Sequence, residues 1–331
     1  MSNPEFTIII PVRNGANYIG AAISSILSQS YPHFRIMILE NGSTDTTIQI
    51  VNAFADDRIS IIPSTSSLNI EENWSRIRDL DLMEYLTILG HDDILYPEFL
   101  AEIVELITTE PSASLYQVQF EYIDSNGDFV RHIPKITYKE TASQFLAAVM
   151  DDKEECCGTG YVMRSKDYRQ VGGIPAYPGL LYADVVLWYR LSNLSYKVCS
   201  PKTLVGYRVH PQNMHRNANF SRYYLATRQY YDFLRTSTDL KDKPEAAHTY
   251  INQQLQLSYR IAVVQAILSP NEGRIQLQTA KREIAEDGLF TLYDRPARVY
   301  EAIPPLPSWL RQIVLLPIIW RRVLRRFLAS H

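Results

Sequence analysis

The chain has little cysteine and no long apolar segment. Its cysteines, Cys156, Cys157 and Cys199, form neither a C-x-x-C pair nor an even set, which excludes a disulfide framework, argues against structural zinc and indicates a reducing compartment. The longest apolar run, Ile313 to Trp320, is broken by a proline and falls short of the ~20 residues that cross a bilayer. The run from Phe6 to Val12 lacks the basic flank and the length of a signal peptide. We therefore expect a cytoplasmic protein.

Neither sign of charge is in large excess, because 33 basic residues stand against 36 acidic ones, with a formal net charge of −3. This balance argues against nucleic acid as the main partner, since a phosphate backbone requires a basic face. The chain also lacks the G-x-G-x-x-G turn of dinucleotide-binding domains and the P-loop. What is present is 46% hydrophobic residues over 331 positions, enough for one large domain with an appendage.

The first hundred residues alternate between strand and helix patterns. The β-branched segment from Phe6 to Val12 predicts a strand, and apolar residues then recur at helical spacing from Tyr18 to Leu27. Further strands are predicted at residues 36–39, 59–62 and 85–89, with helical segments between them. This alternation predicts an α/β fold with a mostly parallel central sheet flanked by helices.

The pattern changes after residue 100. Residues 114–123 and 129–133 predict two arms of a hairpin around a polar turn, so antiparallel strands join the sheet. Further strands are predicted at 158–163 and 197–209, with a helix at 181–191 between them. Helical spacing returns at 220–268 and 274–289, and we expect the tyrosine-rich start of this region to form core.

Residues 84–93 join a buried strand to two adjacent carboxylates. The strand delivers Asp92 and Asp93 to a strand-to-helix loop, and Pro97 fits the first turn of the next helix. Ligands bind beside such loops in open parallel sheets, and carboxylates there can present a divalent cation to a phosphate. The alternative is that the pair only caps the next helix, a position that Asp favours.

Four short segments in this order resemble the GT-A glycosyltransferases of family two. They are Ile8-Ile9-Ile10-Pro11-Val12-Arg13-Asn14-Gly15, Leu39-Glu40-Asn41-Gly42-Ser43-Thr44-Asp45, His91-Asp92-Asp93 and Gly172-Gly173. Each falls at a strand end or turn, and all four lie within the first two thirds of the chain. The resemblance implies a GT-A fold with a C-terminal helical appendage. The implied divisions are a catalytic domain at 1–215, made of a nucleotide-binding half at 1–100 and an acceptor-binding half at 101–215, an appendage at 216–303 and a basic amphipathic tail at 304–331.

The resemblance implies a nucleoside-diphosphate sugar as donor, with UDP-sugars favoured over dTDP-sugars, and Mn2+ or Mg2+ as cofactor. Asp92 is the implied metal ligand, and His210, in a Tyr-Arg-x-His segment, completes the metal shell. Gly90 replaces the first carboxylate of the family's Asp-x-Asp pattern. Ser43, Thr44 and Asp45 belong to the second of the four segments that carry the resemblance. The alternative for these three residues is that they only cap a helix. The residues implied to bind the nucleotide sugar are Pro11, Arg13, Asn14, Glu40, Asn73, Arg76, His91, Asp92, Asp93 and Arg208.

Inverting transfer also needs a general base for the acceptor hydroxyl. In the family this base is the Asp of a Glu-Asp pair that opens a helix, and Asp184 takes its place here, with Ala183 where the family has Glu. The resemblance therefore implies that Asp184 is catalytic. The alternative is that Asp184 only stabilises the N-terminus of a helix through the helix dipole.

The C-terminal tail combines arginines with aromatic and aliphatic residues. On a helix these form two faces: Arg321, Arg322, Arg325 and Arg326 on one, and Trp320, Val323, Leu324 and Phe327 on the other. We expect residues 309–328 to lie on an anionic membrane surface, on the cytoplasmic face of the inner membrane, with packing against the domain as the alternative. A lipid-linked acceptor follows naturally from that location.

The function expected is that of an inverting, metal-dependent glycosyltransferase. It would move a sugar to a glycan or lipid-linked acceptor in bacterial surface-polysaccharide assembly. A catalytically inactive homologue that serves as a binding or scaffold subunit is one alternative, supported by Gly90 and Ala183. A sugar-phosphate nucleotidyltransferase is the other, although it requires a glycine-rich, basic first loop that residues 11–20 do not supply.

Overall fold

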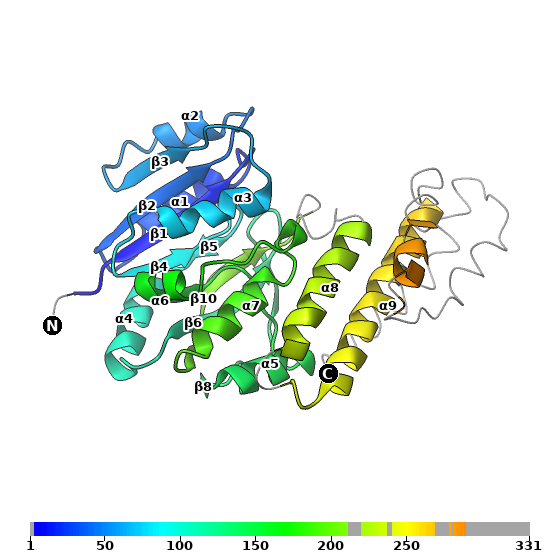
Figure 1. The fold of residues 1–331 in the computed structure, drawn as a ribbon. Helices are drawn as coiled ribbons and strands as arrows, with labels where there is room; N and C mark the ends of the chain where they lie inside the picture. The colour runs from blue at the N-terminus through cyan, green and yellow to red at the C-terminus, as the bar shows by residue number, and fades with distance from the viewer. Residues whose placement is uncertain are drawn as a thin grey trace. The chain divides into compact units, whose positions relative to one another are not determined.

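The computed structural model describes residues 3–210, 220–236, 240–268, 278–279, 281–286 and 288. The contacts within the chain divide it into two compact units, Met1–Arg216 and Asn217–His331. The first unit contains the sheet and the second contains a pair of long helices (Figure 1). The predicted tail, residues 304–331, lies outside the described residues.

One half of the sheet is parallel. Strand β1 (Phe6–Val12) pairs with β2 (Phe34–Glu40) and with β4 (Tyr85–Ile88), and β2 pairs with β3 (Ile59–Pro63). Every residue of β1 is buried, as expected for a strand covered on both faces. The carboxyl ends of these strands meet at one edge of the sheet, where the polar segments predicted from the sequence begin.

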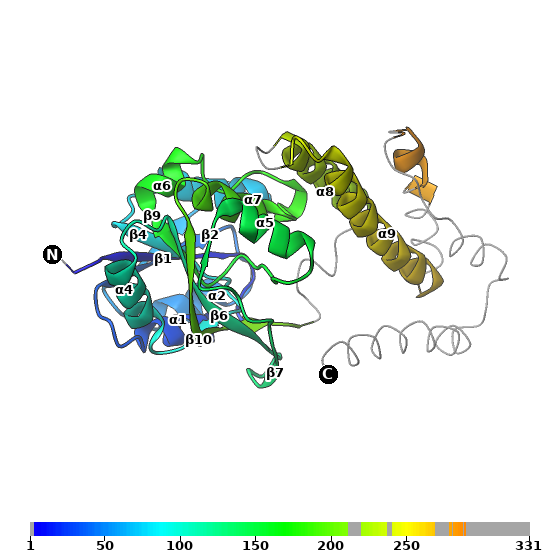
Figure 2. The ribbon, with the colours of Figure 1, turned by 90° about the horizontal axis from the view of Figure 1, so that it is seen from below.

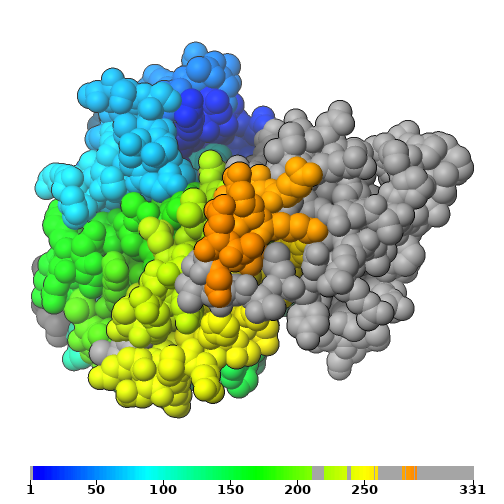
Figure 3. Space-filling model, turned by 45° about the vertical axis from the view of Figure 1, so that its right-hand side comes forward, coloured from blue at the N-terminus to red at the C-terminus, as the bar shows by residue number. Residues whose placement is uncertain are grey.

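The other half of the sheet is mixed. Strand β9 (Tyr161–Arg164) runs antiparallel to β4 and to β6 (Leu115–Ile123), while β10 (Lys197–Arg208) runs parallel to β6. Overall the strand order is β3-β2-β1-β4-β9-β6-β10-β5. The space-filling view shows the two halves, blue to cyan and green, as one continuous body (Figure 3). The short strands at the margins are β5 (Ile94–Leu95), β7 (Phe129–His132) and β8 (Lys139–Glu140).

Helices cover both faces of the sheet. Helices α1 (Ile19–Leu27), α2 (Thr47–Asn52) and α4 (Phe99–Thr109) lie on one side, and α5 (Ala142–Met150), α6 (Ser165–Gln170) and α7 (Ala183–Ser192) lie on the other (Figure 2). Buried residues of α1 recur three and four apart, which gives the apolar stripe that packs on the sheet. The remaining helical elements of the first unit are α3 (Ile70–Ser75), η1 (Arg76–Asp79) and η2 (Pro178–Leu180).

The second unit is built on helices α8 (Phe220–Thr236) and α9 (Pro244–Leu268), which lie side by side (Figure 1). Tyr230 is fully buried between them, with its ring 6.4 Å from that of Tyr250, and Phe220 contacts Tyr259 in the same way. The tyrosine-rich segment therefore contributes core, as its spacing predicts. Among the helices in the described part of the chain, none combines the length and the apolar character that crossing a membrane requires.

Candidate functional site

Asp92 and Asp93 lie in a tight turn directly after β4. Pairing with β1 continues past the strand, since the Leu89 N–H donates to the Ile9 carbonyl at 2.9 Å. The turn closes where the Asp93 N–H donates to the Gly90 carbonyl at 3.1 Å. The Asp92 side chain is 18% exposed and Asp93 only 3%. Asp92 is therefore the carboxylate that a ligand can reach.

The structure brings the two residues predicted to bind metal into contact. Asp92 Oδ2 lies 3.0 Å from His210 Nε2, although the residues are 118 positions apart in the chain. His210 is 6% exposed, and its ring packs against Tyr18 with centroids 4.7 Å apart. Tyr18, at the start of α1, is a site residue that the sequence reasoning missed, because a tyrosine in an amphipathic helix carries no specific signal.

Arg208 and Asp93 hold this turn in place. Asp93 Oδ1 accepts the backbone N–H of Arg208 at 2.8 Å, and burial together with the charge of Asp92 raises the pKa of Asp93. The Arg208 guanidinium donates to the carbonyls of Asp92 at 2.6 Å and Asp124 at 2.9 Å. These contacts tie the aspartates to the turn between β6 and β7. The resemblance implies that both residues bind the nucleotide sugar, with an anchoring role behind the metal ligand as the alternative for Asp93, and these assignments stay predictions.

Gly90 is required by the packing of the two carboxylates. A Cβ at this position would lie 2.6 Å from Asp93 Oδ2 and 2.9 Å from Asp92 Oδ1, closer than real Cβ contacts. A side chain here would displace the carboxylate that anchors Arg208. An aspartate at this position, as in the family's pattern, would therefore require the side chains of Asp92 and Asp93 to shift.

His91 packs against the first strand-end loop. A Cβ on Gly15 would meet the His91 ring at 2.7 Å, so the two segments approach as closely as a glycine allows. Burial lowers the pKa of His91 below its ordinary value, against the opposing charge of Asp92. The imidazole is thus favoured in its neutral form beside the predicted donor loop.

The loops after β1 and β2 are joined by side-chain hydrogen bonds. Asn14, whose φ is 56°, donates its N–H to Ser43 Oγ at 3.0 Å and accepts the Thr44 N–H on its side-chain oxygen at 2.7 Å. Asp45 accepts the N–H of Thr47, in the first turn of α2, at 3.0 Å. Residues 43–45, for which a simple helix cap was the alternative, therefore precede the N-cap of α2, Thr46, and also fix the loop that contains Asn14.

The other residues predicted to bind the nucleotide sugar lie at the same edge of the sheet. Pro11 is buried in β1 and Arg13 is exposed in the loop that follows. The Glu40 carboxylate accepts the Ser43 N–H, and although burial alone raises its pKa, these backbone hydrogen bonds outweigh burial and lower it. Arg76 donates to the Glu40 carbonyl at 3.2 Å and to Asn73 Oδ1 at 2.9 Å. Asn73 and Arg76 thus brace the ends of β2 and β3.

Asp184 lies in the first turn of α7. Its Oδ1 accepts the N–H of Val185 at 2.9 Å, and the helix begins one residue earlier, at Ala183. Leu180 and Tyr182, just before the helix, have φ values of 56° and 64°. Such left-handed conformations cost energy in residues other than glycine, and they concentrate at functional sites.

The segment around Cys157 connects Asp184 with the aspartate turn. Burial raises the pKa of Cys157, and the charges of Asp93 and Asp184 raise it further. The Trp188 indole N–H donates to the Cys157 carbonyl at 3.1 Å. On the same segment, Thr159 contacts Asp93. In the sequence, the glycines at 158 and 160 are only a weak sign of this segment.

Comparison with known proteins decides the family. The sequence model of glycosyl transferase family 2 matches residues 7–172, just over half of the chain. The chain belongs to glycosyltransferase family 2. An uncharacterized glycosyltransferase of Rickettsia conorii is 31% identical over 130 residues, covering 38% of this chain and 21% of that protein. A PGL/p-HBAD biosynthesis glycosyltransferase of Mycobacterium tuberculosis is 36% identical over 121 residues, covering 35% and 47%. The chain thus spans less than half the length of these curated relatives.

Solved structures show the same fold as this family 2 glycosyltransferase. Residues 1–349 of TarS from S. aureus, in complex with UDP-GlcNAc, superpose with a TM-score of 0.62 at 13% identity, covering 83% of this chain and 79% of that one. The mannosyltransferase PcManGT of Pyrobaculum calidifontis, in complex with GDP-Man and Mn2+, gives 0.56 at 14% identity, covering 87% and 83%. The GT-A fold predicted from the four motifs is confirmed.

Proposed function

We propose that this family 2 glycosyltransferase is an inverting, metal-dependent enzyme that transfers a sugar from a nucleoside diphosphate to a glycan or lipid-linked acceptor. The contact between Asp92 and His210, at the edge where the donor loops meet, carries the proposal. A relative named for PGL/p-HBAD biosynthesis and structural neighbours in complex with UDP-GlcNAc and GDP-Man support it. UDP-sugars are the favoured donors, because Glu40 can accept a hydrogen bond from a base imide.

The donor atoms at this edge fit a divalent cation. Asp92 and His210, whose Oδ2 and Nε2 atoms lie 3.0 Å apart, are the residues that would hold the ion. Two protein ligands suffice where diphosphate and water complete the shell. An imidazole ligand favours Mn2+ over Mg2+, which prefers oxygen. When bound, the ion neutralises the charge that develops on the departing diphosphate.

Asp184 is assigned the proton transfer. Its carboxylate takes the proton of the acceptor hydroxyl as that oxygen bonds to the anomeric carbon. The bond from that carbon to the diphosphate breaks on the opposite face, and its electron pair leaves with the diphosphate, so the configuration inverts. The N-terminus of α7 favours the charged carboxylate before transfer. A positioned base of this kind contributes ~10²- to 10⁴-fold in rate.

The remaining residues bind and orient the donor. Arg13 is exposed beside the site, and its guanidinium is available to a phosphate at the surface. Asn14 and Glu40 lie on loops that are already fixed by hydrogen bonds, so donor binding requires little ordering there. Asn73 and Arg76 keep the strand ends that carry these loops in register.

A panel of nucleotide sugars tests the proposal. We expect one of them, with Mn2+, to raise the melting temperature and to be slowly hydrolysed, and EDTA to remove both effects. The variant Asp92→Asn should lose the Mn2+ dependence, while Asp81→Asn, at an exposed carboxylate, serves as the control. Donor binding without turnover would support the alternative of a catalytically inactive homologue, which Gly90 and Ala183 also favour. Neither binding nor turnover with any donor contradicts the proposal.

The cellular setting follows from the proposed acceptor. We infer a role in bacterial surface-polysaccharide assembly, with the protein in the cytoplasm and in peripheral contact with the inner membrane through residues 309–328. The support for the membrane contact is the amphipathic sequence of the tail. A membrane-bound acceptor would place both substrates on the same side of that membrane.

A further inference from the structure

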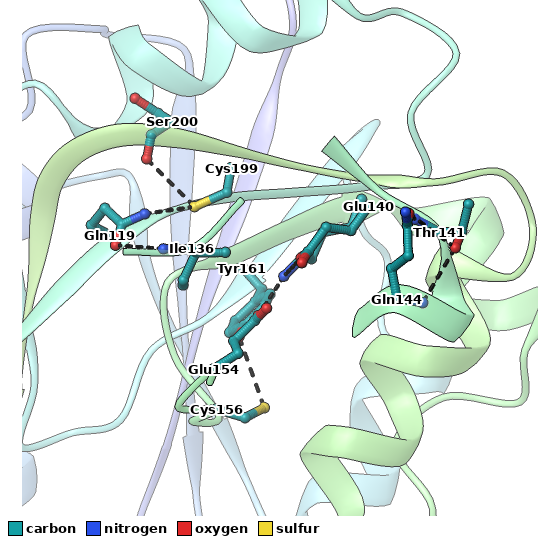
Figure 4. Close-up of polar contacts among 11 residues, drawn as sticks. Gln119, Ile136, Glu140, Thr141, Gln144, Glu154, Cys156, Tyr161, Cys199 and Ser200 are labelled. Carbon is teal, nitrogen blue, oxygen red and sulfur yellow. Dashed lines mark hydrogen bonds and ion pairs between the residues drawn. The ribbon is translucent and has the colours of Figure 1, made fainter. Parts of the chain in front are cut away.

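A buried lysine lies between two buried carboxylates in the mixed half of the sheet. Lys197, the first residue of β10, is fully buried, with Nζ 2.7 Å from Glu140 Oε2 and in contact with Glu154 Oε1. The ammonium also lies 4.7 Å from the ring centre of Phe145 on α5. Figure 4 shows Glu140 and Glu154 pointing toward one another. Buried ion pairs add little stability over apolar residues of similar size, which raises the question of what this one orients.

Glu154 begins a short segment, residues 154–157, which we call the strap. At its start the Glu154 N–H donates to the Ala148 carbonyl near the end of α5 at 3.1 Å. Glu155 then forms a two-point ion pair with Arg131, at 2.7 Å for each contact, and accepts the Tyr122 hydroxyl. The strap is therefore fastened to α5, to the lysine and to the hairpin of β6 and β7.

The far end of the strap is fastened to the helix that contains Asp184. The Cys157 carbonyl accepts the indole N–H of Trp188, which lies one turn after Asp184 on α7. The Trp188 ring stacks on Tyr161 with centroids 4.2 Å apart. Cys156 lies 3.8 Å from the Tyr161 hydroxyl, and Figure 4 shows both beside Glu154.

The charge of Asp184 also acts on the thiol of Cys156 in the strap. Burial raises the pKa of Cys156, and the largest charge effect on it comes from Asp184. Trp188 and Tyr161 are both 1% exposed, so the strap and the first turns of α7 form one packed unit with no room to slide. A displacement of Glu154 would therefore move the surroundings of Asp184.

We infer that Lys197 is a positioning residue for the Asp184 base, acting through Glu154, the strap and Trp188. Lys197 touches neither substrate nor base, and its part is to hold the strap at its first residue. The assignment of Asp184 as base belongs to the proposed function, on which this inference rests. The coupling between Lys197 and α7 is a property of the fold and can be measured without any substrate.

Hydrogen exchange measures that coupling in the full chain. We expect Lys197→Met and Glu154→Ala to speed amide exchange at least 10-fold in residues 154–159 and 183–188. Residues 86–93 should be unchanged. Glu154→Gln, which keeps an oxygen for the ammonium, should behave like the wild type. Lys202→Met removes an exposed ion pair from the same strand and is the matched control. Uniform acceleration over the whole sheet, or none at α7, overturns the inference.

Kinetics separates positioning from mere stability. With the donor and acceptor found by the panel, Lys197→Met should lower kcat about 10-fold and leave the Kd for the nucleotide unchanged. In an Asp184→Asn background the same substitution should cause no further loss, because the base is already gone. An equal loss in both backgrounds overturns the inference. If the wild type acts on no donor, the proposed function fails, and the exchange experiment still decides the coupling. If Lys197→Met does not fold, Glu154→Ala and Glu154→Gln carry both experiments.

Discussion

Gly90 limits which side chains the aspartate turn accepts. Because a Cβ would lie 2.6 Å from Asp93 Oδ2, we expect Gly90→Ala to cost ~1–3 kcal/mol of unfolding free energy. Gly90→Asp should cost more, since it adds a third negative charge, and should not improve Mn2+ binding. Urea denaturation and metal titration measure the two effects. Gly20→Ala, in helix α1 with its nearest neighbour at 3.4 Å, is the control and should be neutral or stabilising. Tighter Mn2+ binding by Gly90→Asp would contradict this account.

Asp184 is the residue whose role is most directly testable. Asp184→Asn keeps the size of the side chain and removes its basicity, so we expect transfer to fall ~10²- to 10⁴-fold while the Kd of the donor stays unchanged. Initial rates and donor titration measure the two quantities. Asp151→Asn, at an exposed carboxylate that pairs with Lys153, is the control. Equal transfer by the Asn variant would remove Asp184 as the base.

Glu154 gives the fold a specific pH dependence. Burial raises the pKa of Glu154 from 4.5 to about 7, and Glu140 adds to the shift while Lys197 opposes it. Other titratable groups that interact with Glu154 are Cys156, Tyr161 and Cys199. Between these values the folded protein binds more protons than the unfolded chain. The contribution of this group to stability therefore falls as pH rises from 4.5 to 7 and is constant above that.

Glu154→Gln should remove this dependence. The free energy of unfolding of the wild type minus that of the variant should decrease by up to ~3 kcal/mol between pH 4.5 and 7. Urea midpoints at several pH values, combined with the slope of each curve, give this difference. A difference that stays flat over this interval would show that Glu154 is ionised throughout.

At the scale of elements, the turn between β6 and β7 and the turn after β4 are joined through one guanidinium. Arg208→Lys keeps the charge but cannot reach the carbonyls of both Asp92 and Asp124. We expect a loss of ~2–4 kcal/mol in unfolding free energy, because buried carbonyls lose their partners, and weaker Mn2+ binding as Asp92 shifts. Denaturation and metal titration test both. Arg58→Lys, in a partly exposed ion pair, is the control. Equal stability of the two variants would count against the role of Arg208 in joining the two turns.

The elements differ in how far the sequence could predict them. β1 followed from its continuous β-branched run and α1 from the helical spacing of its apolar residues, because both signals are local. The long strand β10 was predicted as a strand, but its insertion between β6 and β5 depends on pairing between distant residues, which local pattern does not encode. For the same reason the contact between Asp92 and His210 rested on family resemblance, and the lysine between Glu140 and Glu154 was not foreseen. A lone Lys at a strand start carries no sign that it is buried.

At the scale of the whole molecule, the tail predicts membrane attachment. Deleting residues 307–331 should release the protein from vesicles that contain anionic lipid, because the arginine face of the tail is removed. Flotation assays with anionic and neutral vesicles measure the effect, and 1 M salt should weaken binding by the full chain. A variant with the four arginines of the tail changed to glutamine is the matched comparison. Unchanged binding after deletion would reject the tail as the anchor.

The wide separation of Asp92 and His210 in the chain has a consequence for biosynthesis. On the ribosome, β1 to β4 and the aspartate turn emerge long before β10, so the nascent chain carries Asp92 without its partner for 118 residues of translation. Arg208, which fixes the same turn, is also made late. The proposed cation site is therefore completed only when the first unit is almost fully synthesised, and chains released earlier lack it.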